Sequence, residues 1–255
     1  MEFSKENLIN TTTAVTLQSN TILAQNLFNP DVNYQCFSEG YSNDLTTTSI
    51  TINFDSTTPV SRIAMLEHNL KEYSFYYNGA TANAINLNGA HTTTASFNAN
   101  SDTAQFFKFD TIQASSITLD MKATQVADKE KVISFLYMAD LYFEFDRVPS
   151  ANGYKPTIAP KQIVHRLGDG GTKIHNIDAK FNIDITFKYL TEAQRDQLRT
   201  IYDLKAPFYF TFMPTATAWD SVFFEANWPG AFDFLKYSDN AVATGFSGKI
   251  KLQET

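Results

Sequence analysis

The segment AKFNIDITFKY, residues 179–189, alternates strictly between apolar and polar side chains. The odd-numbered positions from 179 to 187 are apolar, and the even-numbered positions from 180 to 188 are polar. Because successive side chains of a strand point to opposite faces, this pattern predicts a half-buried β-strand. Such a strand needs neighbours beside it and a core against its apolar face, so the chain must build a sheet.

Shorter apolar runs separated by Asn, Thr, Ser and Gly occur along the rest of the chain, for example at residues 49–54, 60–66 and 73–79. The segment DSTTP at 55–59 is typical of a turn between the first two runs. Their spacing, with 22 Phe and 12 Tyr among 255 residues, predicts an all-β, mainly antiparallel protein. A chain of this length accommodates two β-sandwich domains.

The segment RVPSANGYKPTIAPK, residues 147–161, holds three prolines and a glycine. It is typical of a linker, which predicts a first domain over 1–148, a linker over 149–160 and a second domain over 161–255. The alternative is a long loop inside one domain.

One short α-helix is expected in the second domain, near residues 191–204. Thr191 and Gln194 fit a capping box, in which each side chain bonds the other's backbone N–H. Leu198 and Ile201 recur at helical spacing, so this helix should pack on the sheet.

The composition excludes several classes of partner. The net charge is −7 and the Lys and Arg residues form no cluster, which disfavours nucleic acid. The single cysteine excludes an internal disulfide, and the opening residues show no signal peptide. No run reaches the roughly 20 apolar residues of a membrane helix, so we expect no membrane insertion. No motif indicates a cofactor.

The segment HRLGDGGTKIH, residues 165–175, brings two histidines and a glycine-rich turn together. A phosphate loop requires a Lys-Ser/Thr pair at the start of a helix, and here a strand follows. If residues 169–171 form a hairpin loop, His165 lies directly opposite His175. Zinc requires three or four ligands, so we expect packed neutral histidines and no metal site. A shared metal ion is the alternative.

No constellation of residues indicates catalysis. His68 has the chemistry of a general base but no nucleophile in its motif, and Cys36 lies among aromatic residues, as a buried thiol does. Scattered carboxylates could supply a glycosidase pair, and examples are Asp220, Glu225, Asp233 and Asp239. We expect no catalytic residue and no enzyme, with a glycoside hydrolase as the remaining enzymatic alternative. Trp219 and Trp228 are expected in a core rather than stacked on a sugar.

Residues 26–70 resemble the opening of discoidin-like, galactose-binding-like β-sandwich domains found in bacteriophage tail proteins. The resemblance lies in the entry NLFNPD, the strands SITINFD and SRIAML, and the HNL that closes them. Family members often carry Trp where this chain has Cys36 and Phe37. The second half resembles the C-terminal part of such proteins, through KQIVHRLGDGGTKIH, TEAQRDQLRTIYDLKAPFYFTF and GFSGKIKLQE.

This resemblance implies a structural component of the virion, namely a minor or distal tail protein. Such a protein acts in assembly and in contact with the host surface. It works as a homo-oligomer with other tail proteins as partners. Its expected location is the tail of the virion, after assembly in the host cytoplasm.

A carbohydrate-binding module is the alternative function, with a host-surface glycan as partner. Discoidin-like sandwiches bind ligands through loops at one end, and two loops, 34–44 and 86–91, offer aromatic rings and amides that suit sugars. The candidate glycan-binding residues are Tyr34, Tyr41, Asn43, Asn86, Asn88 and His91. Solvated turns are the competing interpretation of these loops.

Overall fold

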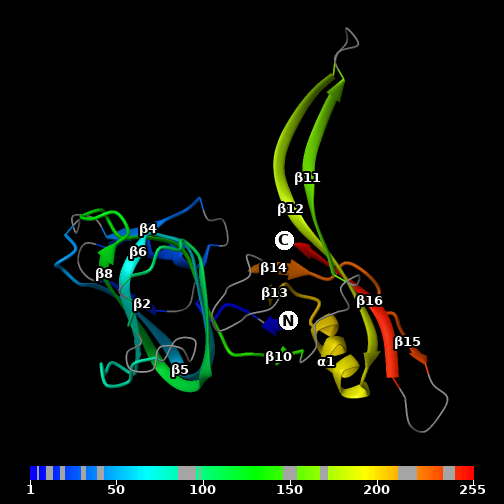
Figure 1. Cartoon of the computed structure of the whole chain (residues 1–255), viewed down its shortest axis with the longest axis horizontal. Coiled ribbons are helices and arrows are strands. Elements are labelled where there is room, and N and C mark those ends of the chain that lie inside the picture. Colours follow the sequence, from blue (N-terminus) through cyan, green and yellow to red (C-terminus); the bar gives the residue numbers. More distant parts are fainter. Residues whose placement is uncertain are drawn as a thin grey trace. The chain divides into compact units, whose positions relative to one another are not determined.

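The computed structural model describes residues 1–4, 6–9, 14–17, 21–29, 33–38, 43–85, 96–97, 99–145, 154–166, 172–211, 223–237 and 245–255. The chain divides into two compact units (Figure 1). The sandwich unit is formed by Glu6–Tyr142. The helix-bearing unit combines Met1–Lys5 with Phe143–Thr211 and Val222–Thr255. The predicted all-β, mainly antiparallel class is confirmed, because every strand pairing between described residues is antiparallel.

The sandwich unit contains eight described strands, ordered β3-β4-β9-β5-β8-β6-β7, with β2 paired to β5. A 3₁₀ helix, η1 (Ala24–Phe28), packs beside β4 and β9. The strands are β2 (Ala14–Leu17), β3 (Thr21–Ile22), β4 (Cys36–Ser38), β5 (Thr48–His68), β6 (Leu70–Tyr77), β7 (Ser96–Phe97), β8 (Gln105–Thr124) and β9 (Val132–Ala139).

Two long strands, β5 and β8, join the halves of this unit. The first part of β5 pairs with β2 and the second with β9, while β8 follows β5 along both parts. The turn predicted at 55–59 is wrong: β5 continues through it with a register shift between Asn53 and Thr58. Bulges allow a strand to bend and pass from one layer to the next, so polar exposed residues mark a bend rather than a chain reversal.

The sandwich core is aliphatic and aromatic. Ile50, Ile52, Phe75, Phe107 and Leu119 are all at most 1% exposed and belong to one contiguous cluster. Alternation along β5, β6 and β8 places these side chains in the same interior.

The helix-bearing unit contains one eight-stranded sheet with the order β10-β1-β13-β14-β16-β12-β11, and β15 pairs with β16. Its elements are β1 (Glu2–Ser4), β10 (Phe143–Glu144), β11 (Tyr154–Arg166), β12 (Thr172–Leu190), α1 (Glu192–Asp203), β13 (Phe208–Thr211), β14 (Phe223–Asn227), β15 (Phe234–Tyr237) and β16 (Gly245–Glu254).

The strand predicted at 179–189 is confirmed as part of β12. Ile183, Ile185 and Phe187 are buried, whereas Lys188 is exposed. The apolar face therefore lines the core of this unit, as the alternation predicts.

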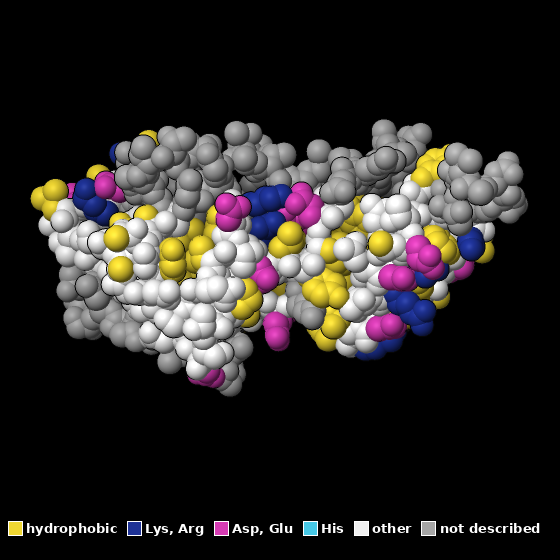
Figure 2. Space-filling model, turned by 90° about the horizontal axis from the view of Figure 1, so that it is seen from below, with side chains coloured by type: hydrophobic (Ala, Val, Ile, Leu, Met, Phe, Trp, Pro, Cys, Tyr) yellow, Lys and Arg dark blue, Asp and Glu magenta, His cyan; other side chains and the backbone are white. Residues whose placement is uncertain are grey.

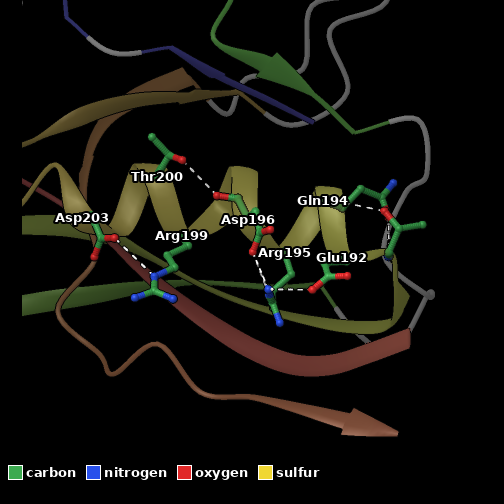
Figure 3. A network of polar contacts seen from close by, with 8 residues as sticks. Glu192, Gln194, Arg195, Asp196, Arg199, Thr200 and Asp203 are labelled. Atoms are coloured by element: carbon green, nitrogen blue, oxygen red, sulfur yellow. Dashed lines mark hydrogen bonds and ion pairs between the residues drawn. The ribbon is translucent and has the colours of Figure 1, made fainter. Parts of the chain in front are cut away.

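The predicted helix is confirmed as α1, including its capping box. The Thr191 hydroxyl accepts a hydrogen bond from Gln194 N at 3.2 Å, and Gln194 Oε1 accepts one from Thr191 N at 3.0 Å. Leu198 and Ile201 are buried against the sheet. The opposite face is solvated and charged (Figure 3), with an ion pair at 3.4 Å between Arg199 and Asp203.

Phe3 lies in the aromatic core of the helix-bearing unit, on the second strand of its sheet. Strand β1 pairs with β10 on one side and β13 on the other, and Phe3 is completely buried. Its ring centroid lies 4.8 Å from that of Phe143, 5.2 Å from Phe210 and 6.0 Å from Phe145. The domain predicted over 1–148 therefore differs from the structure: its first residues and Phe143–Phe145 belong with the second half of the chain.

The linker predicted over 149–160 also differs from the structure. Strand β11 begins at Tyr154, so residues 154–160 are paired with β12. Proline is tolerated on an edge strand, because the missing N–H faces outward there. Residues 149–153 lie outside the described part of the chain.

The hairpin register expected at 165–175 is wrong by two residues. His165 is paired with Lys173, and His175 is paired with Ile163. His165 is exposed, so it is not packed at the rim of a core. The loop expected at 169–171 lies outside the described part of the chain.

We expect the Phe3→Ala variant to destabilise the helix-bearing unit by about 3–5 kcal/mol, because a fully buried ring leaves a cavity that neighbouring rings cannot refill. Urea unfolding followed by tryptophan fluorescence measures the effect, since Trp228 belongs to this unit. Leu235→Ala, at a residue 69% exposed in the same unit, is the matched control. An unchanged midpoint for Phe3→Ala would refute this role.

Candidate functional site

Residues 158–166 of β11 and 172–181 of β12 form a two-stranded hairpin, which we call the ribbon. Strand β12 pairs with β16 only from Asn182 onward, and residues 172–181 pair with β11 alone among the described strands. Figure 1 shows this ribbon extending away from the rest of its unit. An isolated two-stranded hairpin is marginally stable in water, so the ribbon is suited to pack against something else.

The ribbon exposes apolar side chains on one face. Ile158 is 61% exposed and Val164 is 55% exposed. The pairing shifts register between Lys161 and Gln162, and the extra residue is on β12. Alternation along β11 therefore places Ile158 and Val164, six residues apart, on the same face. Ile158 is paired with Phe181, whose ring stacks on Phe224 at 6.0 Å. This face therefore continues the core face of the unit beyond the point where the core ends.

The outer edge of the ribbon is poorly suited to strand addition. Strand β11 is at the end of the sheet order, and it contains Pro156 and Pro160. Proline has no N–H to donate, and prolines or lysines on an edge strand block pairing with another chain. The face of the ribbon, rather than its edge, is thus the surface available for contact.

Cationic residues accompany the apolar pair. Lys155 and Arg166 are exposed, as is His165. Alternation along β11 places Arg166 on the same face as Val164 and Ile158, and Lys155 and His165 on the opposite face. The apolar face of the ribbon therefore carries a cation at its outer end.

A second candidate surface lies in the sandwich unit, where hydrogen bonds join two loops, 43–47 and 124–131. The Asp44 carboxylate accepts bonds from Thr124 N at 3.0 Å and from its hydroxyl at 3.1 Å. Lys131, which is 1% exposed, donates to the Thr46 carbonyl at 2.8 Å. Asp44 N donates to Asp128 Oδ1 at 3.2 Å. These contacts fix the two loops side by side.

Asp44 and Lys131, which clamp the two loops together, each favour the charged form of the other. Burial lowers the pKa of Lys131, and the nearby Asp44 carboxylate partly offsets that effect. Burial tends to raise the pKa of Asp44, but hydrogen bonds from Thr124 and the charge of Lys131 outweigh it, so this pKa is lower than usual.

The clamped loops carry an exposed apolar pair and several carboxylates. Leu45 is 87% exposed and Val126 is 64% exposed. Asp128 and Glu130 are exposed on the second loop. Asp102 is also exposed. It lies beside the second loop, because its carbonyl accepts a hydrogen bond from Gln125 Nε2 at 2.9 Å. We call Leu45, Val126, Asp102, Asp128 and Glu130 the loop patch. Lys129 is also exposed there.

The candidate glycan-binding residues are only partly placed. Tyr34 is 53% exposed and precedes β4. Asn43 is exposed, but its Oδ1 accepts a bond from Leu45 N at 2.8 Å, which gives it a role in its own loop. No contact between these two residues is found. Tyr41, Asn86, Asn88 and His91 lie outside the described residues.

The residues considered for catalysis have structural roles where they are described. Burial raises the pKa of the Cys36 thiol to about 12, as expected of an inert buried thiol. Trp228 packs against Tyr202 of α1 and against Phe232, at 5.4 and 5.8 Å. Asp220 and Asp239 lie outside the described residues. Glu225 accepts a bond from the Thr255 hydroxyl at 2.7 Å, and Asp233 lines an open hollow of about 680 Å³ beside Tyr189 and Leu235.

His68 is buried at the end of β5 and is 2% exposed. Its Nδ1 accepts a bond from Leu70 N at 3.2 Å, and its Nε2 has no partner among the described residues. Burial lowers the pKa of His68 to about 4. The imidazole is therefore neutral and shielded from solvent, unlike an accessible general base.

Metal-ligand clusters and membrane-spanning helices can be sought only among the described residues. No group of three or more His, Cys, Asp or Glu side chains is placed to hold a metal ion within the described ranges. Over the same part of the chain, no helix is long and apolar enough to cross a bilayer. The face drawn in Figure 2 shows Lys and Arg beside Asp and Glu, and no histidine among its coloured atoms.

No family model and no curated protein matches the sequence. Solved structures similar to this chain include carbohydrate-binding modules. A chitosan-binding module from a Paenibacillus chitosanase/glucanase has a TM-score of 0.42 and 10% identity, covering 53% of this chain and 99% of the module. A Clostridium perfringens module in complex with GalNAc-β-1,3-galactose has a TM-score of 0.41 and 13% identity, covering 53% and 100%. A pectin-binding module has a TM-score of 0.38 and 16% identity, covering 52% and 93%.

The burial of His68 predicts a pH-dependent stability. The unfolded chain binds a proton near pH 6.5 and the folded chain only near pH 4, so stability is fully present above 6.5 and falls as the pH drops toward 4. A shift of this size corresponds to about 3 kcal/mol. Urea unfolding from pH 7.5 to 4.5 measures the loss.

Two variants isolate the contribution of His68 to this loss. In His68→Asn the amide oxygen can still accept from the backbone two residues on, and the loss should be smaller by most of that amount. His165→Asn, at an exposed histidine, should keep it. Equal loss of stability in His68→Asn and the wild type between pH 7.5 and 4.5 would show that His68 does not cause the pH dependence.

Proposed function

We propose that this protein is a structural subunit that self-associates through the apolar face of the β11–β12 ribbon. The observation that carries this proposal is the exposure of Ile158 and Val164 on the ribbon. The two strands of the ribbon pair with each other and with no third described strand. Burying such a face removes apolar area from water and stabilises the marginal hairpin at the same time. A folded scaffold requires no reactive group for this role.

The sequence resemblance supports a bacteriophage tail as the assembly, with the protein as a minor or distal tail component in the virion. Tail proteins act as repeated copies joined by identical contacts, and a protruding ribbon is suited to reach a neighbouring copy. Other tail proteins are the further partners in this proposal.

Carbohydrate binding is a second candidate function, favoured by the exposure of Tyr34. A half-exposed tyrosine ring can stack on a sugar face. The solved modules similar to this chain include ones named for binding chitosan and pectin. Under this candidate, the sandwich unit would contact a glycan on the host surface while the helix-bearing unit assembles.

Self-association should be lost when charge is placed on the ribbon face. Each apolar side chain removed from water contributes roughly 1.5–3 kcal/mol, so Ile158→Asp with Val164→Asp should raise the dissociation constant at least about tenfold. Sedimentation equilibrium over a range of protein concentrations gives this constant.

The matched control is Leu235→Asp with Tyr189→Asp. These residues are 69% and 68% exposed in the same unit, and this variant should associate like the wild type. A wild-type protein that stays monomeric at all concentrations would contradict the proposal, as would equal weakening by both pairs of substitutions.

The glycan hypothesis has its own test. Tyr34→Ala should remove most binding to any glycan that the wild type recognises on an array, because a sugar that stacks on this residue needs its aromatic face. Leu23→Ala, at another partly exposed apolar residue of the sandwich unit, should bind normally. An array with no wild-type signal would eliminate this candidate.

A further inference from the structure

Charge is unevenly distributed along this chain. Residues 6–142 contain 13 Asp or Glu and six Lys or Arg, so they carry the whole net charge of −7. The segment 158–181, which includes both strands of the ribbon, contains four Lys or Arg and two Asp. The sandwich unit and the ribbon therefore have opposite sign, and complementary charge favours their association between molecules.

The loop patch and the ribbon are also complementary in their exposed side chains. The patch exposes Leu45 and Val126 among carboxylates, and the ribbon face exposes Ile158 and Val164 with Arg166 beside them. An apolar centre with a charged rim is the usual anatomy of a protein interface. Each surface supplies what the other lacks.

The loop patch is held in one shape before any partner binds. Lys131 and Asp44 clamp the two loops through Thr46 and Thr124. Asn69 extends this order, since its Nδ2 donates to the Glu130 carbonyl at 2.6 Å and its Oδ1 accepts from Val132 N at 2.9 Å. A preorganised surface loses less conformational freedom on binding.

We infer that the ribbon of one copy docks on the loop patch of a second copy. This inference rests on the proposed self-association and names the two surfaces that meet. Because the two surfaces differ, the contact is between unlike patches and can propagate from copy to copy, closing a ring if the rotation allows.

Charge reversal on each side tests the inference in the full-length protein. The ribbon variant is Val164→Glu with Arg166→Glu, which places two carboxylates on the docking face, and the patch variant is Asp102→Lys with Glu130→Lys. Each variant alone should associate at least tenfold more weakly than the wild type by sedimentation. An equimolar mixture should form a 1:1 complex, because one intact pair of surfaces, the wild-type patch and the wild-type ribbon, is restored.

The matched control reverses two carboxylates elsewhere in the sandwich unit. Asp55 and Asp110 are exposed at the bends of β5 and β8, and Asp55→Lys with Asp110→Lys changes the net charge equally. This control should associate like the wild type. Thermal unfolding of every variant confirms that it is folded, and a misfolded patch variant is replaced by Leu45→Asp with Val126→Asp, which should also associate weakly.

The outcomes separate this inference from the proposed function. A wild type that never associates overturns both. A wild type that associates, with a patch variant that associates equally well, overturns the inference alone and leaves contact between two ribbons. Weak association of both single variants without recovery in the mixture also overturns it.

Discussion

The packing of Phe3 among the rings of Phe143, Phe145 and Phe210 is the interaction on which the helix-bearing unit depends. It joins the first strand of the chain to strands more than a hundred residues later. Since β1 and β10 are antiparallel neighbours, the chain leaves this unit and returns to it at adjacent strands, and the sandwich unit is an insertion between them. The same aromatic core continues through Phe210, Phe224 and Phe181 to the base of the ribbon.

The sequence predicts individual elements well and their partners poorly. The alternation at 179–189 and the capping box at Thr191 depend on neighbouring residues, and both are confirmed. The linker at 149–160 and the turn at 55–59 were inferred from proline and polar content, which also suits edge strands and bends. Strand register depends on contacts with distant residues, so the pairing of His165 with Lys173 could not be read from the hairpin sequence alone.

The candidate site shows the same limit. Nothing in the sequence around Ile158 and Val164 distinguishes them from core residues of a strand. Their face is exposed because β16 pairs with β12 only from Asn182 onward. The run KQIV beside the prolines was an available signal that this segment is a strand. The loop patch was also missed, because the clamp of Lys131 on Thr46 joins residues 85 positions apart. The glycan candidates came from loop composition, and only Tyr34 and Asn43 could be placed.

The central claim is that the ribbon is covered when copies of this protein associate. Hydrogen–deuterium exchange of peptides spanning residues 154–166, at protein concentrations below and above the association midpoint, tests it most directly. The account predicts slower exchange in these peptides in the associated state, together with slower exchange across 43–47 and 124–130. Association with unchanged exchange in the ribbon would contradict the account.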